Sequence, residues 1–189
     1  MKLMFISDIH GISTNLKKIK EKFEELKCDK LVVLGDLYYI GPRNKMIEGY
    51  NISEVQEFLE SMKDKLLCMR GNCDSEVDLM VSNFPIMNDL SLIMTENHDL
   101  YITHGHIYNE SNWRKDHSIL IYGHLHIPFI KKIETNYYVN PGSISLPKEG
   151  YLPSYMIYDE NKVTIYDIED NIIMEEELKW KEIPQEQSF

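Results

Sequence analysis

The chain has 189 residues, of which 43% are hydrophobic and 27% charged, and its net charge is -11 from 20 basic and 31 acidic residues. This length and composition predict a single globular domain, residues 1–189, with a sizeable hydrophobic core. The acidic balance argues against a long nucleic acid partner, because such binding depends on cationic contacts with phosphates. A small phosphorylated substrate remains compatible with it, because bound divalent cations would reverse the local field.

The cysteines and the apolar runs indicate the cellular setting. Cys28, Cys68 and Cys73 show no paired spacing, so neither a disulfide framework nor a thiolate zinc site is expected. No apolar run reaches the roughly 20 residues of a membrane span. The run at the amino terminus is interrupted by Asp8 too early for a signal peptide. We therefore expect a reduced, cytoplasmic protein with no membrane partner.

The first half of the chain alternates predicted strands and helices. Continuous apolar runs predict buried parallel strands at 2–6, 31–34 and 66–69. Apolar residues at helical spacing predict helices over 16–26 and 53–62, and a short third helix follows residue 75.

From residue 90 the runs become shorter and begin to alternate. Strands are predicted at 90–94, 100–103, 119–122, 129–133, 137–139, 155–158, 163–168 and 172–178. The alternation after residue 155 suggests antiparallel strands with one face in solvent. Parallel units that pass into antiparallel strands predict an α/β protein with two packed sheets and helices outside.

Polar residues suited to metals follow five of these strands. They are Asp8, His10, Asp36, Asn72, His104, His124 and His126. Strand ends of a layered α/β protein converge on one edge, so these residues can meet in space. Oxygen and imidazole donors without thiolate suit Mn, Fe, Zn or Co. The set is larger than one tetrahedral ion needs, and with one bridging aspartate it fills two sites about 3.5–4 Å apart.

The motifs Asp-x-His, Gly-Asp, Gly-Asn-x-Asp, His-Gly and Gly-His-x-His occur in this order over residues 8–126. This series resembles the calcineurin-like metallophosphoesterase superfamily. Stretches 41–44, 70–78 and 140–143 are similar to its YfcE-type phosphodiesterase branch. Each motif alone is weak evidence, whereas five in the right order are strong. The resemblance implies a four-layer αββα sandwich of two mixed sheets flanked by helices.

The resemblance also implies two divalent metal ions, with Mn²⁺ expected and Ni²⁺, Co²⁺, Zn²⁺ and Fe²⁺ open. The ligands implied for one ion are Asp8, His10, Asp36 and His126. Those implied for the other are Asp36, Asn72, His104 and His124, so that Asp36 bridges the pair. Such a centre lowers the pKa of a shared water and polarises phosphoryl oxygens, so we expect hydroxide to attack a small phosphodiester in line.

Two further residues bear on the substrate. Cys73 follows Asn72, where the wider superfamily usually has a histidine placed to assist the leaving group. A thiol with an ordinary pKa near ~8.5 can donate a proton but adds no positive charge at neutral pH. We therefore expect diesters to be favoured over monoesters. Arg43 either clamps the substrate phosphate through its guanidinium group or faces solvent.

The remaining histidines and methionines receive plainer interpretations. We expect His106 to pack behind the ligands rather than to bind a metal. His98 and His117 lie in polar stretches and are expected at the surface, whereas Met87, Met94 and Met156 are expected in the core.

Two other functions compete with the enzyme. A retromer sorting subunit resembles this superfamily and acts through protein contacts, so a protein-interaction scaffold with vestigial activity is the alternative. The scaffold is disfavoured because every expected ligand position keeps a coordinating side chain. A nuclease for long DNA or RNA is disfavoured by the acidic balance and the lack of a basic or aromatic stripe.

The resemblance suggests a homo-oligomer, a dimer or tetramer.

Overall fold

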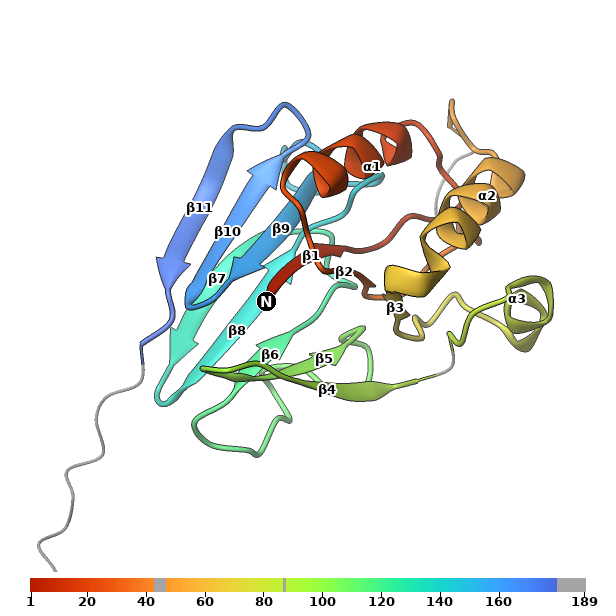
Figure 1. Cartoon of the computed structure of the whole chain (residues 1–189). Coiled ribbons are helices and arrows are strands. Elements are labelled where there is room, and N and C mark those ends of the chain that lie inside the picture. Colours follow the sequence, from red (N-terminus) through yellow and green to blue (C-terminus); the bar gives the residue numbers. More distant parts are fainter. Residues whose placement is uncertain (43–46, 87, 180–189) are drawn as a thin grey trace, which may run out of the picture.

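The computed structural model describes residues 1–42, 47–86 and 88–179, and it is a sandwich of two mixed β-sheets (Figure 1). The strands of the first sheet are β1 (Lys2–Ile6), β2 (Lys30–Val33), β3 (Leu66–Cys68), β9 (Ser154–Asp159), β10 (Lys162–Asp167) and β11 (Ile172–Glu177). Those of the second are β4 (Leu90–Met94), β5 (Asp99–Thr103), β6 (Ile119–Ile121), β7 (Pro128–Ile133) and β8 (Asn136–Pro141). Each predicted strand is present.

The direction of the central strands positions the site. The first sheet has the order β11-β10-β9-β1-β2-β3, and the second has the order β4-β5-β6-β8-β7. Strands β1, β2 and β3 run parallel, as do β5, β6 and β8, whereas β9 pairs with β1 in the antiparallel sense. The carboxyl ends of parallel neighbours lie at the same edge of a sheet, so the residues after these strands are brought together.

The first sheet separates the two larger clusters of the hydrophobic core. Along β1, Met4 and Ile6 face the helices, while Leu3 and Phe5 face the second sheet, and all four are fully buried. Burial of such a side chain contributes about 1.5–3 kcal/mol. A strand buried on both faces must be apolar throughout, which explains the continuous run in the sequence.

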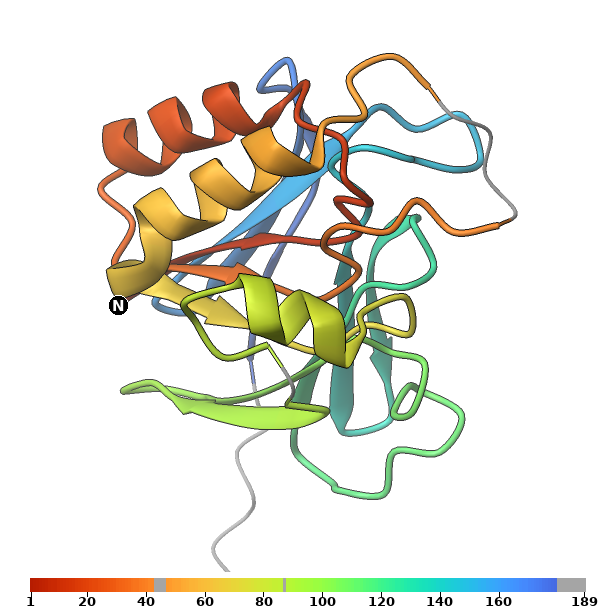
Figure 2. The same ribbon diagram turned by 90° about the vertical axis from the view of Figure 1, so that its right-hand side faces the viewer.

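Helices α1 (Leu16–Glu25) and α2 (Ile52–Met62) cover the outer face of the first sheet (Figures 1 and 2). Helix α2 begins at Asn51, whose side chain accepts a hydrogen bond from the Glu54 main-chain N–H. A 3-10 turn (Lys63–Lys65) and the short helix α3 (Glu76–Val81) follow. No helix among the described residues is both long and apolar enough to cross a membrane.

The outer face of the second sheet is covered differently. Its apolar side chains Leu120, Tyr122 and Tyr138 pack with Trp113, which comes from the turn-rich segment 105–117. In the described part of the chain, this segment forms the outermost layer in place of a helix.

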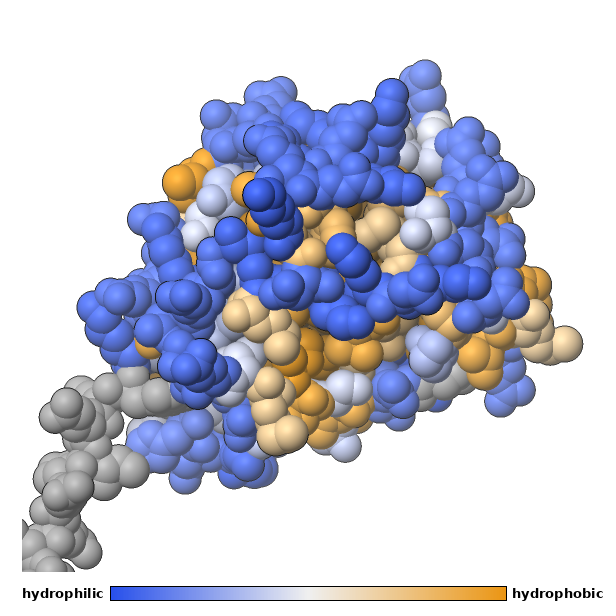
Figure 3. Space-filling view, viewed as in Figure 1, coloured by the Kyte–Doolittle hydropathy of each residue, from blue (hydrophilic) through white to orange (hydrophobic). Residues whose placement is uncertain are grey.

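The structure corrects two of the plainer expectations. His98 is only 7% exposed, because its Nδ1 contacts the hydroxyl of buried Tyr158 at 3.2 Å. Met94 is 72% exposed, because it lies on the outer face of the edge strand β4. Figure 3 shows exposed apolar side chains in orange along the lower part of the molecule, over β4 and toward α3. His117 is exposed and Met156 is buried, as predicted, and Met87 lies outside the described residues.

Candidate metal centre

The turns that carry the predicted ligands hold an uncommon backbone conformation. Five of these residues have φ between 52° and 66°, namely Asp8, His10, Asp36, His124 and His126. Non-glycine residues in this left-handed region cost of order 1–3 kcal/mol each and cluster at functional sites. Hydrogen bonds between turns hold them there, including Asp8 N–H to the Gly35 carbonyl at 3.1 Å and His10 N–H to the Asp36 carbonyl at 2.9 Å.

Three imidazoles are oriented in the same way. In each, Nδ1 donates to a main-chain carbonyl oxygen at 2.7 Å, in the pairs His10 with Tyr39, His104 with Leu34 and His126 with Leu146. A carbonyl oxygen can only accept, so Nδ1 carries the proton. In the neutral ring, Nε2 then presents its lone pair to the interior of the site, as a metal ligand requires.

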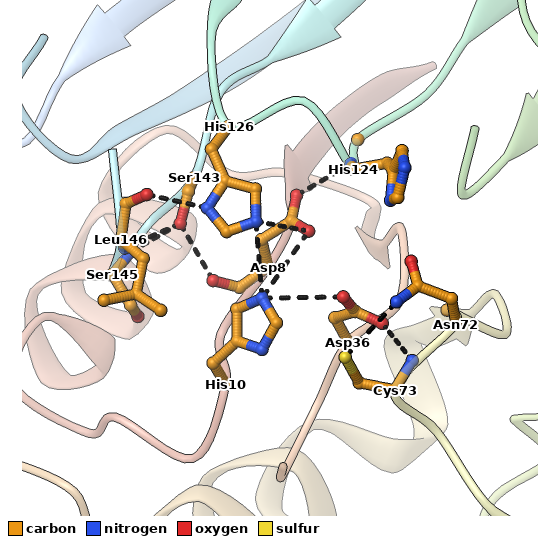
Figure 4. Close-up of polar contacts among 12 residues, drawn as sticks. Asp8, His10, Asp36, Asn72, Cys73, His124, His126, Ser143, Ser145 and Leu146 are labelled. Atoms are coloured by element: carbon orange, nitrogen blue, oxygen red, sulfur yellow. Dashed lines mark hydrogen bonds and ion pairs between the residues drawn. The ribbon is translucent and has the colours of Figure 1, made fainter. Parts of the chain in front are cut away.

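The atoms that meet around Asp8 suit a cation. Nε2 of His10 and Nε2 of His126 are 3.4 Å apart, and Nε2 of His126 lies 3.3 Å from Oδ1 of Asp8 (Figure 4). Oδ1 of Asp8 is buried and has no hydrogen-bond partner among the described residues. Lone pairs and a carboxylate oxygen that face one another repel, and a bound cation would satisfy all of them.

A proton competes with a metal for the same atom. Burial lowers the pKa of His126, but the Asp8 carboxylate more than offsets this, and the net shift is upward. Burial also disfavours the charged form of Asp8, but the contact with His126 and the charges of His104 and His126 hold the pKa of Asp8 below its usual value. Metal binding at this point would therefore release a proton.

Asp36 lies between two groups of donors. Its Oδ2 is 3.5 Å from Nε2 of His10 and also 3.5 Å from Nε2 of His104. Nε2 of His104 is in turn 3.2 Å from Oδ1 of Asn72, so two acceptor atoms again face each other. This is the position expected of a ligand shared between two ions.

Two histidines take other positions. Among the described residues, the His124 ring belongs to none of the groups of converging His, Cys, Asp and Glu atoms. The main-chain N–H of His124 donates to Oδ2 of Asp8 at 3.0 Å, and its ring packs against His104 with centroids 5.1 Å apart. The His106 ring packs against both His104, with centroids 5.3 Å apart, and His124, with centroids 6.3 Å apart, which fits the expected packing role.

Two glycines are required by close approach of the backbone to the carboxylates. A Cβ atom on Gly71 would lie 2.1 Å from Oδ1 of Asp36. A Cβ atom on Gly123 would lie 1.8 Å from Oγ of Ser7 and 2.8 Å from Oδ2 of Asp8. Any side chain at either position would displace an aspartate of the site.

Asp74 is a functional residue that the sequence interpretation missed. Its buried carboxylate accepts main-chain N–H bonds from Asp36 at 2.8 Å, Leu37 at 2.7 Å and Gly71 at 2.7 Å. Burial raises the pKa of Asp74, although these bonds oppose the shift. Asp74 thereby ties the turn after β2 to the turn after β3. The signal was the aspartate that ends the Gly-Asn-x-Asp motif.

We predict that Asp74→Ala destabilises the fold by about 3–5 kcal/mol, because it leaves three buried N–H groups without an acceptor. Urea unfolding measures the change. Asp78→Ala is the matched control, since the Asp78 carboxylate caps only the exposed helix α3 by accepting from the Ser75 N–H. The control should cost about 1 kcal/mol. Equal losses in the two variants would contradict the role assigned to Asp74.

Cys73 lies beside Asp36, in a pocket of about 340 Å³ above the donor atoms. Its main-chain N–H donates to Oδ1 of Asp36 at 2.8 Å, and its Sγ accepts from Nδ2 of Asn72 at 3.3 Å. Burial and the Asp36 charge raise the pKa of Cys73 to about 12, so without bound cations it is a neutral thiol. Arg43, the expected phosphate clamp, lies outside the described residues.

The comparisons with known proteins agree with this geometry. The calcineurin-like phosphoesterase superfamily domain matches residues 1–162. Phosphodiesterase YfcE of Escherichia coli K12 is 38% identical over 176 residues, covering 92% of this chain and 96% of the relative. The probable metallophosphoesterase YsnB of Bacillus subtilis is 25% identical over 186 residues, covering 92% of this chain and 95% of the relative.

Solved structures support the same conclusion. The structure of Yfce, a phosphoesterase from E. coli, superposes with a TM-score of 0.91 at 37% identity, covering 95% of this chain and 100% of the other. Vacuolar Protein Sorting 29 from Cryptosporidium parvum has a TM-score of 0.63 at 18% identity, covering 93% of this chain and 97% of the other, and shares the fold. Two mixed sheets with aspartates and histidines converging at one edge, together with a family match over most of the sequence, show that this chain belongs to the calcineurin-like phosphoesterase superfamily.

Proposed function

We propose that this chain is a phosphoric diester hydrolase that cleaves small phosphodiesters at a centre of two divalent metal ions. The observation that carries the proposal is the position of Asp36, whose Oδ2 lies 3.5 Å from Nε2 of both His10 and His104. The similarity to a relative named as a phosphodiesterase, over nearly the whole of both chains, supports this reaction class.

The ligand sets are those expected from the sequence. One ion would be held by Asp8, His10, Asp36 and His126, and the other by Asp36, Asn72, His104 and His124. Oxygen and imidazole donors suit manganese, and Ni²⁺, Co²⁺, Zn²⁺ and Fe²⁺ also fit. When bound, the ions would lower the pKa of a water and polarise the phosphoryl oxygens.

The chain itself supplies orientation. The Nδ1 hydrogen bonds of the three buried imidazoles keep each Nε2 lone pair aimed at the site, so little reorganisation accompanies binding. Asp74 holds the main chain of Asp36 at 2.8 Å. The Cys73 thiol forms part of the pocket wall, where it can donate a proton without adding positive charge.

The scaffold function is the weaker candidate. Sorting subunits share this fold at 18% identity, which bears on architecture alone. A scaffold has no need of buried carboxylates and lone pairs that face one another without a partner. The small substrate, the homo-oligomer and the cytoplasmic location remain predictions.

Removal of the metals tests the proposal. Dialysis against a chelator should abolish hydrolysis of bis(p-nitrophenyl) phosphate, because the donor atoms alone cannot activate water. Manganese should restore it, with about two ions bound per chain at full activity. A parallel series with Ni²⁺, Co²⁺, Zn²⁺ and Mg²⁺ identifies the best metal. Activity that survives complete chelation, or full activity with a single ion, would contradict the proposal.

A further inference from the structure

We propose that Lys148 determines specificity by binding a second anionic group of the substrate, apart from the phosphate that is cleaved. The preferred substrates would then be phosphodiesters that carry an additional phosphate or carboxylate close to the scissile bond. This inference rests on the proposed function, and it names the substrate class for the same pocket.

Lys148 is anchored to the metal-binding turn through its main chain. Its N–H donates to the carbonyl oxygen of His126 at 3.1 Å, and its own carbonyl accepts from the Tyr151 N–H at 3.1 Å. Glu149 and Gly150, with φ of 55° and 80°, form the tight turn between these bonds. In Figure 2 the loop between β8 and β9, which carries Lys148, lies at the same edge as the loop between β2 and α2. The base of the side chain is therefore fixed at the pocket rim.

The ammonium group of Lys148 is available to a ligand. Lys148 contributes the positive charge to the described lining of a pocket whose other titratable groups are one carboxylate, three imidazoles and a thiol. It forms no ion pair with any residue in 1–42, 47–86 or 88–179, although the chain has 31 acidic residues. An anionic group of the substrate can pair with this ammonium group, whereas the acidic remainder of the molecule repels anions.

The shape of the pocket separates the two anionic groups. Asp8 and Asp36 are at most 2% exposed, so a phosphate bound over them sits at the floor, whereas Lys148 is exposed at the rim. The pocket, of about 340 Å³, has room for a drug-sized ligand and not only one phosphoryl group. Pro42 and Leu125, which are also exposed, add apolar surface to the lining of the same pocket. An organic substituent that extends from the buried floor to the exposed rim would contact this apolar surface and place an anion against Lys148.

A matched pair of substrates tests this arrangement. The first is the p-nitrophenyl ester of thymidine monophosphate, and the second is the same ester with a further phosphate on its free sugar hydroxyl. Both have the same scissile bond and leaving group. The manganese-loaded protein should prefer the second ester by about tenfold in kcat/KM, mainly through a lower KM. This tenfold preference corresponds to a charge-assisted hydrogen bond of ~1.4 kcal/mol.

Substitutions of Lys148 test whether its positive charge causes the preference for the second ester. Lys148→Met keeps the aliphatic stem and should abolish the preference for the second ester. Lys148→Arg keeps the charge and should retain the preference. Lys17→Met makes the same change of net charge on the exposed face of α1 and should leave the preference intact. The preference should also weaken with added salt, because the contact is exposed.

Other outcomes are equally informative. If Lys148→Met slows both esters by the same factor, the lysine contacts the scissile phosphate and the inference is wrong. The inference is also wrong if the wild-type protein cleaves both esters equally well. If the manganese-loaded wild-type protein cleaves neither ester nor bis(p-nitrophenyl) phosphate, the proposed function itself fails.

Discussion

Asp36→Asn is expected to lower turnover of an aryl phosphodiester by more than about 10³-fold while the fold remains intact. The amide is isosteric, and its oxygen can still accept the N–H bond that Cys73 donates to Oδ1 at 2.8 Å. It removes the negative charge from the oxygen that lies 3.5 Å from both His10 and His104. Since both proposed ions share this carboxylate, both should bind more weakly.

The measurements are kcat/KM with bis(p-nitrophenyl) phosphate, metal content after loading, and thermal unfolding followed by circular dichroism. Asp64→Asn is the matched control, because Asp64 is exposed on the 3-10 turn away from the site. It should change none of the three. A fully active Asp36→Asn protein would show that the carboxylate does not bridge.

Cys73→His is expected to change which ester is cleaved. The wild-type protein should cleave aryl phosphodiesters clearly and alkyl phosphomonoesters poorly, because a neutral thiol gives an alkoxide leaving group little help. A positioned general acid contributes about 10²–10⁴-fold. Imidazole at this position should raise monoester hydrolysis by up to about 10²-fold and diester hydrolysis by much less, with metal content unchanged.

The ratio of kcat/KM for a matched monoester and diester measures this effect. Cys73→Ser is the control, because it keeps a small polar group in the pocket and adds no imidazole. Its ratio should stay near that of the wild type. If the ratios of the histidine variant and the wild type coincide, Cys73 only packs beside Asp36 and does not set the preference.

The strands were predictable because their pattern is local. β1 and β6 are buried on both faces, and their apolar runs show this directly. The two wrong predictions of burial concern side chains whose exposure depends on the order of strands in a sheet. Met94 lies in an apolar run but on the edge strand β4, and His98 lies in a polar run but packs under Tyr158. Strand order comes from pairing between distant segments, which a local pattern does not carry.

The same division applies to the candidate site. The sequence alone determined the chemical types of the donors, because carboxylate and imidazole side chains at strand ends mark a metal-binding edge whatever surrounds them. It did not reveal which atoms orient those donors. The carbonyl oxygens of Tyr39, Leu34 and Leu146 belong to the main chain, which every residue possesses, so no residue type marks them.

Tertiary structure likewise decided the positions of Asp74 and Lys148. Asp74 accepts hydrogen bonds from main-chain N–H groups that lie 37 and 38 residues away in the chain. From the sequence alone, an aspartate at this position is explained equally well as a helix cap. Lys148 resembles any solvated lysine until the turn around His126 places it at the pocket rim. The kind of ligand atom that a residue offers depends on its side chain, so it can be predicted from the amino-acid sequence. Orientation and proximity depend on folded distances between segments, and these exist only once the two sheets have packed.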